Sequence, residues 1–460
     1  MIKKAKKINI SLLILSLIFT GLDAYTFQEI PFSWIGYAMS AIILLIIGLD
    51  KFKKFLYSKF LITYWIAYAI LITLIQYFKY SEEVPDLKYS SFDRYILLRL
   101  LVIIFFLFTL SNLYNISNHF SFEILAKIVI YSSLFISFMS LISYFSYVFE
   151  YSDFYRNRIG TNSNSIQKVL DACTILRNYG TFREPSFLAV WLSPTVPFYF
   201  FKFKESPKLQ YLVLFPILSI VLSRSLTGIF GFTLAMFITF IFFTFKNSRN
   251  YYLLFPIILI LIFSTFGNSL TYKFPALDAA QCPPNSADKC DCSIYDDEED
   301  LAKNSVNLNQ SIFNRAKIIV NGGVANFENI SRINSYLSEK NVTLLGDGFG
   351  IANVKFTNDF NKNNKIIRNN EVQNIYPGLI VSMNNLYANV YFSTGIFGLI
   401  LFFVSLIQIS VSILKQSISR SPILFASFLN ILIMYFFQGE ELSLFFAYII
   451  GMSLSQKENN

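Results

Sequence analysis

The chain has 460 residues, of which 54% are hydrophobic, 18% aromatic and only 15% charged. Soluble chains carry about 25% charged residues, and 51 Phe with 28 Tyr are too many for one soluble core. The composition therefore argues against a soluble enzyme and predicts an all-α polytopic membrane protein, because the apolar residues come in blocks of about 17 to 25, the length that crosses a bilayer. The net charge of +9 is explained by basic cytoplasmic loops and calls for no nucleic-acid partner.

The first apolar block follows four lysines within the first seven residues. A basic start of this kind also opens cleavable signal peptides, which is the alternative. However, Gly21-Leu22-Asp23-Ala24 is a poor cleavage site, and another long apolar block follows. We therefore predict that the first block is a retained membrane span.

Twelve apolar segments are predicted to be membrane spans. They lie at residues 8–22, 32–49, 60–78, 95–113, 124–148, 185–202, 209–223, 226–245, 251–267, 386–412, 421–437 and 441–455. The last segment is short and contains Gly451, so eleven spans with a re-entrant end are the alternative. Domain boundaries follow from this pattern: nine spans in 1–267, a large loop subdomain in 268–385, and three spans with a tail in 386–460.

Lysine and arginine gather in alternate loops, which predicts the orientation of the chain. One face receives the N-terminal lysines, Lys51, Lys53, Lys54, Lys59, Lys202, Lys204, Lys208, Lys246, Arg249, Lys415, Arg420 and Lys457. We expect this face and both termini to be cytoplasmic. The loop at 149–184 and the large loop at 268–385 then lie outside the cytoplasm, on the opposite face from the only histidine, His119.

The large loop combines irregular and ordered patterns. Helical spacing of apolar residues covers 311–340, and a glycine turn follows at 341–349. The cysteines Cys173, Cys282, Cys290 and Cys292 all fall on the oxidising side, which favours one or two disulfides, with three pairings open. A zinc site is the weaker alternative. The acidic run at 296–300 is interpreted as a solvated loop, with a divalent-cation site as the alternative.

One short stretch concentrates charge directly before an apolar segment. It runs from Arg177 to Phe187 and includes Arg183 and Glu184. At the mouth of a span, a cation can hold a lipid-borne phosphate and a carboxylate can accept a proton. The structural alternative is that Arg183 and Glu184 simply pair with each other.

A second arginine lies in a very tight turn, Ser223-Arg224-Ser225, between two predicted spans. A charge at the membrane centre costs about 2.5 to 3.5 kcal/mol, and less toward the interface, so such residues are kept near a partner or a water-filled cavity. We therefore favour a functional role for Arg224. For Arg158 and Arg315 we favour a structural role, in which the side chains reach lipid headgroups.

Four segments resemble the O-antigen polymerase and ligase superfamily, in that family's order. They are Gly180 to Pro185, Leu222 to Gly228, Arg332 followed by the glycines of Leu344 to Gly350, and Asn384 to Tyr387 leading into Gly395 to Leu399. The resemblance implies a fold like that of the C-type glycosyltransferases. It also implies a bacterial inner-membrane location, with an active site on the periplasmic side that acts on polyprenyl-linked sugars.

The resemblance also assigns roles to individual residues. Arg183, Arg224 and Arg332 would hold the pyrophosphate of the donor, while Asn385 and Tyr387 would line the acceptor side. Further substrate-binding candidates are Arg177, Gly348 and Asn384. Glu184, Asp347 and Glu440 compete for the role of base.

Asn384 stands where the ligases usually carry histidine, which favours a polymerase. The expected reaction joins undecaprenyl-pyrophosphate-linked repeat units and releases undecaprenyl pyrophosphate, with no metal or cofactor required. Expected partners are the lipid-linked donor and acceptor, membrane lipids and a polysaccharide chain-length regulator. The alternatives are an O-antigen or protein-glycan ligase, which shares the arginines, and a flippase or exporter, which would need charged residues inside several spans.

Overall fold

The fold was obtained as a computed structural model of the whole chain. Several segments of the chain, among them most of the large loop, are not described here. The structure describes residues 2–27, 30–58, 60–80, 91–149, 169–170, 175–201, 207–244, 253–260, 262, 333, 344–363, 365–368, 371–374, 380, 383, 385–437, 439 and 442–455.

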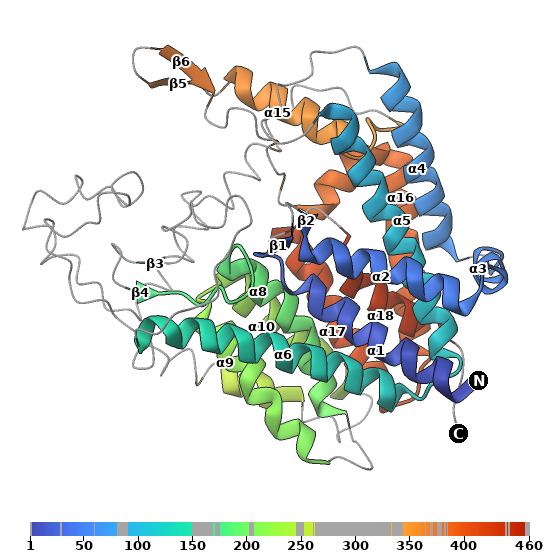
Figure 1. Cartoon of the computed structure of the whole chain (residues 1–460), viewed down its shortest axis with the longest axis vertical. Coiled ribbons are helices and arrows are strands. Elements are labelled where there is room, and N and C mark those ends of the chain that lie inside the picture. Colours follow the sequence, from blue (N-terminus) through green and yellow to red (C-terminus); the bar gives the residue numbers. More distant parts are fainter. Residues whose placement is uncertain are drawn as a thin grey trace, which may run out of the picture. The chain divides into compact units, whose positions relative to one another are not determined.

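The described part of the chain is mostly helical (Figure 1). The α-helices are α1 Ile2–Thr20, α2 Phe32–Ile47, α3 Leu49–Leu56, α4 Leu61–Lys79, α5 Phe92–Ser117, α6 Phe122–Val148, α8 Pro185–Leu192, α9 Leu214–Leu222, α10 Leu226–Thr244, α15 Ile351–Asn363, α16 Leu386–Leu414, α17 Ser421–Phe437 and α18 Leu444–Leu454, and the 3₁₀ helices are η1 Ser193–Phe200 and η2 Pro207–Val213. Three antiparallel hairpins join β1 Thr26–Phe27 to β2 Ile30–Pro31, β3 Val169–Leu170 to β4 Ile175–Leu176, and β5 Lys365–Arg368 to β6 Glu371–Asn374.

The chain folds into two compact units, each assembled from separate stretches of sequence. Unit 1 comprises Met1–Met39, Phe120–Ile318 and Ser417–Met434. Unit 2 comprises Ser40–His119, Ile319–Gln416 and Tyr435–Asn460.

In unit 1, helix α6 packs along α1, α9 and η1 (Figure 1). Its buried face carries a stripe of small polar residues, which are Ser132, Ser133, Ser137, Ser140, Ser143 and Ser146. Small side chains let helix backbones approach closely, and their hydroxyl groups bond across or along the helices. The hydroxyl groups of Ser133 and Tyr199, for example, lie 2.7 Å apart.

In unit 2, α4 packs along α16, and α5 packs along α18. Helix α18 has only 11 residues, and all of them are buried. At 1.5 Å per residue it is about 16 Å long, well short of the roughly 30 Å hydrocarbon core. Its close approach to α5 depends on Gly451, where a Cβ would lie 2.5 Å from Leu113 Cβ.

A glycine turn lies at residues 344–350, in the region where the sequence predicts one. It is hydrogen bonded to α16 beside a break in that helix. Gly395 has φ 66° and ψ −170° inside α16, a conformation that is essentially restricted to glycine. The turn lies against this break: Asp347 N donates to Phe392 O, and Gly348 N donates to Ser393 O, both at 2.8 Å. From α4, Gln76 Nε2 donates to Gly346 O at 2.8 Å.

Gly346→Ala is expected to lower the free energy of unfolding by about 3 kcal/mol, since overpacking and backbone strain add. Gly346 has φ 81°, and its Cβ would lie 2.4 Å from Gly395 N, a backbone atom that cannot move aside. Gly48→Ala is the control for backbone strain alone, because Gly48 has φ 100° but nothing within 4 Å of its Cβ, and we expect a smaller loss of about 1 to 2 kcal/mol. Thermal unfolding in detergent would measure both losses in stability. Equal losses would show that the packing of the glycine turn against α16 does not contribute to the stability of the fold.

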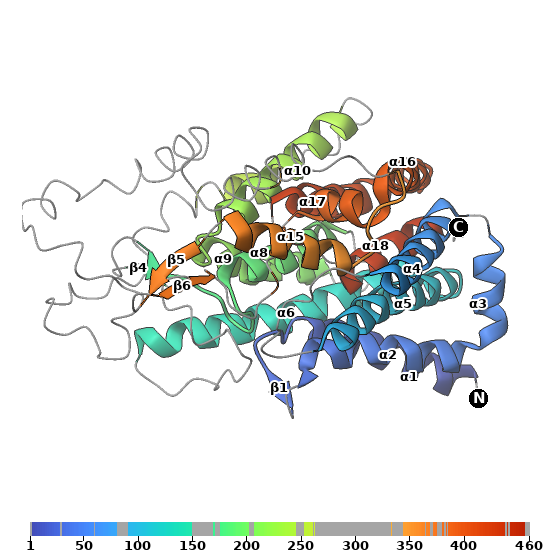
Figure 2. The same cartoon turned by 90° about the horizontal axis from the view of Figure 1, so that it is seen from above.

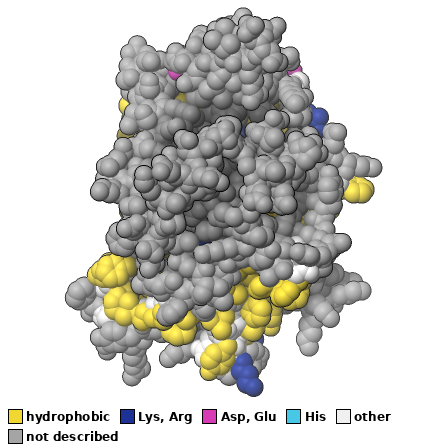
Figure 3. All heavy atoms as spheres, turned by 90° about the vertical axis from the view of Figure 1, so that its left-hand side faces the viewer, with side chains coloured by type: hydrophobic (Ala, Val, Ile, Leu, Met, Phe, Trp, Pro, Cys, Tyr) yellow, Lys and Arg dark blue, Asp and Glu magenta, His cyan; other side chains and the backbone are white. Residues whose placement is uncertain are grey.

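Five described helices are long and apolar enough to cross a membrane, or six if the bent pair α2–α3 counts as one span. They also expose apolar side chains, as expected of helices that face lipid. On α16 the exposed stripe is Phe397, Ile400, Val404, Ile407 and Val411. On the face shown in Figure 3, hydrophobic side chains predominate among the described ones along its lower edge.

The chain is therefore an all-α polytopic membrane protein, as its composition predicts. The count of twelve spans and the C-type glycosyltransferase fold stay predictions.

Two predicted spans are not continuous α-helices. Predicted span 185–202 contains α8 and then the 3₁₀ helix η1, because Pro194 and Pro197 interrupt the α-helical hydrogen bonds there. Within 251–267 the structure describes helix only over 254–260 and at 262. The sequence pattern also did not predict that the apolar segment at 32–49 breaks at Gly48 and continues as the separate helix α3.

Candidate functional site

The stretch from Arg177 to Glu184 lies in unit 1 as a buried segment with charged ends. The five residues between Arg177 and Arg183 are buried, whereas Arg177, Arg183 and Glu184 are partly exposed. Gly180, with φ 51°, passes so close to α6 that a Cβ would lie 2.6 Å from Ser140 Cβ. The buried residues 178–182 thus fix the backbone of the segment, and the side chains of Arg177, Arg183 and Glu184 reach its partly exposed surface.

Helix α6 and the loop after α1 hold this segment in place. Ser140 Oγ donates to Asn178 Oδ1 at 2.9 Å. Ala24 N donates to Thr181 O at 2.9 Å, and the Thr181 hydroxyl donates in return to Gly21 O. The bond between Thr181 and Gly21 joins residues 160 positions apart in the sequence.

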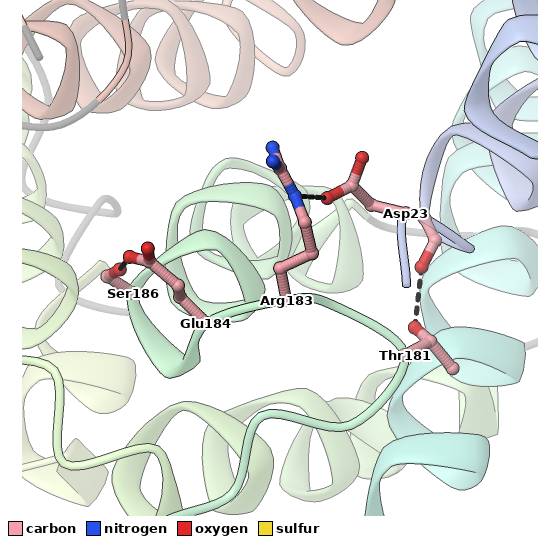
Figure 4. A network of polar contacts seen from close by, with 6 residues as sticks. Asp23, Thr181, Arg183, Glu184 and Ser186 are labelled. Carbon is pink, nitrogen blue, oxygen red and sulfur yellow. Dashed lines mark hydrogen bonds and ion pairs between the residues drawn. The ribbon is translucent and has the colours of Figure 1, made fainter. Parts of the chain in front are cut away.

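Arg183 pairs with Asp23 from the loop after α1 (Figure 4). Its Nε lies 2.8 Å from Asp23 Oδ2, and the two side chains are 37% and 17% exposed. The outer guanidinium nitrogens point away from the backbone of the segment, while Nε faces Asp23 (Figure 4). The guanidinium carbon lies 5.6 Å from the centre of the Phe187 ring on α8. The carboxylate and the ring together limit the orientations that Arg183 can adopt.

Glu184 begins α8 and faces a different partner. It is the N-cap residue, and Pro185 occupies the first helical turn, where the fixed φ of proline favours helix initiation. The Glu184 carboxylate accepts from Ser186 Oγ at 3.2 Å, whereas Arg183 pairs with Asp23. The two neighbouring charges are thus held by different groups, and the carboxylate stays partly exposed.

The turn between α9 and α10 joins the same site. Asn178 N donates to Leu222 O at 2.8 Å, and Arg177 Nε donates to Ser223 O at 3.1 Å. Ser225 Oγ accepts from Gly228 N at 3.2 Å and so caps the start of α10. The turn residue Arg224 is therefore adjacent in the chain to the carbonyl that binds Arg177.

Arg224 has an unusual backbone conformation. Its φ is 52°, and it is the only non-glycine residue with positive φ among those the structure describes. The left-handed region costs an ordinary L-residue roughly 1–2 kcal/mol, and glycine is the residue commonly found after a helix end. Such strain at a site is a reason to look for a function of the side chain.

Unit 2 holds the candidates Asp347 and Gly348, which have structural partners. Asp347 Oδ1 pairs with Lys355 Nζ of α15 at 2.8 Å, with both side chains about one-fifth exposed, at 19% and 22%. The Gly348 amide donates to Ser393 O. These bonds hold the glycine turn against α15 and α16.

Asn385 and Tyr387 lie at the start of α16 in unit 2. Asn385 Oδ1 accepts from Ala388 N at 3.0 Å as the N-cap of the helix, and Asn385 Nδ2 donates to Phe436 O at 2.9 Å. The Tyr387 ring stacks on Phe403, with centroids 5.8 Å apart. Both residues support the beginning of α16.

Four sequence-predicted residues thus lie in unit 1. Arg177 is bonded to the turn that contains Arg224, and Arg183 and Glu184 follow at the other end of the same buried segment. The candidates Arg332, Asn384 and Glu440 lie outside the described residues. So do the four cysteines, the acidic run, and Arg158 and Arg315.

Sequence reasoning missed Asp23 as a site residue. In the sequence, Asp23 is conspicuous only as part of a poor cleavage site, although the predicted orientation places Asp23 and Arg183 on the same side of the membrane. An acidic residue directly after an apolar block is a weak signal, and nothing in the sequence specifies a partner 160 residues away. No family model, curated protein or solved structure matches this chain.

Proposed function

We propose that this protein is a surface-polysaccharide polymerase that joins polyprenyl-pyrophosphate-linked repeat units at the periplasmic face of the inner membrane. The observation that carries the proposal is the junction in unit 1: the segment with Arg177 and Arg183 is hydrogen bonded to the turn that contains Arg224. Three arginines thus belong to two segments, residues 177–183 and the turn at 223–225, that are hydrogen bonded to each other within an apolar helical bundle.

Guanidinium groups suit a pyrophosphate ligand. Each is planar, cannot be neutralised at physiological pH and binds phosphate oxygens two at a time. Asp23 engages Nε of Arg183 at 2.8 Å and so limits the orientations of its planar guanidinium group. Asp23 therefore acts in this proposal as a positioning residue for Arg183.

The reaction is a displacement at the anomeric carbon of the donor. A hydroxyl oxygen of the acceptor repeat unit forms the new bond to that carbon, while the bond from the carbon to the pyrophosphate oxygen breaks. The electron pair leaves with the polyprenyl pyrophosphate, where the arginines stabilise the added negative charge. The hydroxyl proton passes to a carboxylate acting as general base.

Glu184 is the candidate base that the structure favours among those it describes. It is adjacent in the chain to Arg183 and partly exposed, and its carboxylate accepts from the neutral hydroxyl group of Ser186 at 3.2 Å. Asp347, by contrast, already pairs with the ammonium group of Lys355 at 2.8 Å.

The experiment that tests the proposal compares surface glycan from wild-type cells with glycan from a deletion strain. A polymerase deletion should reduce the long ladder to a single repeat unit on its acceptor, and the plasmid-borne gene should restore the ladder. Loss of even the single unit would point instead to a ligase or a flippase. An unchanged ladder would contradict all three functions.

A further inference from the structure

Helix α3 departs from the direction of the helix before it. The pair α2–α3 is bent by 101° at Gly48, whose φ of 100° is readily adopted only by glycine. Figure 2 shows α3 running across the direction of α2. An eight-residue helix that turns this sharply away does not continue the span.

One face of α3 packs on the ends of two candidate spans in unit 2. Phe55 is fully buried, and its ring lies 5.7 Å from that of Phe60, just before α4, and 5.3 Å from that of Tyr114, near the end of α5. Phe52 stands edge-on to Phe108 of α5 at 5.6 Å. Because α4 begins and α5 ends here, α3 lies at the boundary of the apolar layer.

The outward face of α3 is basic. Lys51, Lys53 and Lys54 are exposed, and with Asp50 they give the helix a net charge of 3 − 1 = +2. Leu56 and Tyr57 are also exposed, at 37% and 81%. Exposed lysines beside exposed apolar and aromatic side chains are typical of a helix that lies in the membrane interface.

We propose that α3 is an interfacial helix that binds the headgroups of anionic phospholipids through Lys53 and Lys54. The lysine ammonium groups contact the lipid phosphates, while Phe52 and Phe55 fasten the helix to α5. This inference is independent of the proposed glycan chemistry, since it concerns only unit 2 and the lipid around it.

The test uses the full-length protein in nanodiscs of phosphatidylcholine alone or with a third phosphatidylglycerol. Native mass spectrometry would count bound phosphatidylglycerol, and hydrogen exchange would follow the amides of α3. A lysine near an anionic surface contributes about 1 kcal/mol, or about fivefold in affinity. We expect Lys53→Gln/Lys54→Gln to weaken phosphatidylglycerol binding about 25-fold and to abolish the lipid-dependent protection of residues 49–56.

The matched control is Lys79→Gln/Arg94→Gln, which removes two exposed charges at the other end of α4 and α5. It should leave the protection of α3 unchanged. Equal losses in the two variants would overturn the proposal, as would full protection in phosphatidylcholine alone. Protection by inorganic phosphate in detergent would instead indicate a small-anion site and would also overturn it.

A salt titration of the unaltered protein keeps the test independent of how the variants fold. At 1 M salt the Debye length is about 3 Å, so an electrostatic contact with headgroups should be lost. Phosphatidylglycerol-dependent protection that persists at this salt concentration would contradict the role of the lysines.

Discussion

Replacing Arg183 by alanine is expected to lower polymer formation by at least about 100-fold while the protein is still made and inserted. Losing one preorganised group that stabilises the charge of a transition state typically lowers the rate by this factor. Arg183 is 37% exposed, so its loss leaves no sealed cavity and little packing is lost. The measurement is the length distribution of surface glycan from the deletion strain carrying each variant, with protein levels determined in parallel.

Two further variants separate charge from geometry at this position. Arg183→Lys keeps the charge but loses the planar fork, so we expect it to recover only part of the activity. Arg94→Ala, which removes an exposed arginine from the first turn of α5, should give the wild-type ladder. Normal polymer from Arg183→Ala would show that this guanidinium does not bind the leaving group.

Asp23 gives a sharper test of the same pair. We expect Asp23→Ala to lower polymer formation about 10-fold, because the charge of Arg183 remains but the bond that orients it is lost. In Asp23→Ala/Arg183→Ala the loss should equal that of Arg183→Ala alone, since a positioning residue has nothing left to orient. Independent, additive losses would assign Asp23 a role of its own.

Arg224→Gly is expected to abolish polymer, by at least about 100-fold, while stabilising the fold relative to Arg224→Ala. Glycine adopts the φ of 52° at this position without strain, whereas alanine keeps the cost of the left-handed conformation. The two variants should therefore differ by about 1 kcal/mol in the free energy of unfolding. Thermal unfolding in detergent and the glycan ladder measure the two properties separately.

This pair distinguishes a functional arginine from a structural one. If Arg224 serves only the turn, Arg224→Gly should keep both the fold and the polymer. If its side chain holds the pyrophosphate, both variants should lose polymer despite their different stabilities. If Arg224→Gly made longer polymer than Arg224→Ala, in line with its higher stability, this result would contradict the proposed role.

Local features of the sequence predicted much of the fold. Apolar blocks of span length determine helices in a membrane, because the bilayer core offers backbone groups no hydrogen-bond partner other than the helix itself. Glycines at 346, 348 and 350 predicted a turn for an equally local reason, and all three adopt positive φ. Composition, periodicity and turn chemistry act within a few residues, so the sequence shows them directly.

The sequence did not show where the helices would break. The bend at Gly48 depends on packing as well as on the local glycine. Phe52 and Phe55 make α3 a separate helix by fitting against α5. These contacts join residues more than 50 positions apart, which periodicity within one segment cannot reveal.

The candidate site likewise combines residues that the sequence identifies with contacts that only the tertiary structure determines. The sequence by itself identified Arg177, Arg183, Glu184 and Arg224, because charges beside apolar segments are costly and therefore conspicuous. Only the tertiary structure joined Arg177 to the turn before Arg224, paired Arg183 with Asp23, and engaged Asp347 with Lys355. Charge and hydropathy belong to single residues, whereas a partner is determined by the three-dimensional path of the backbone between two distant positions.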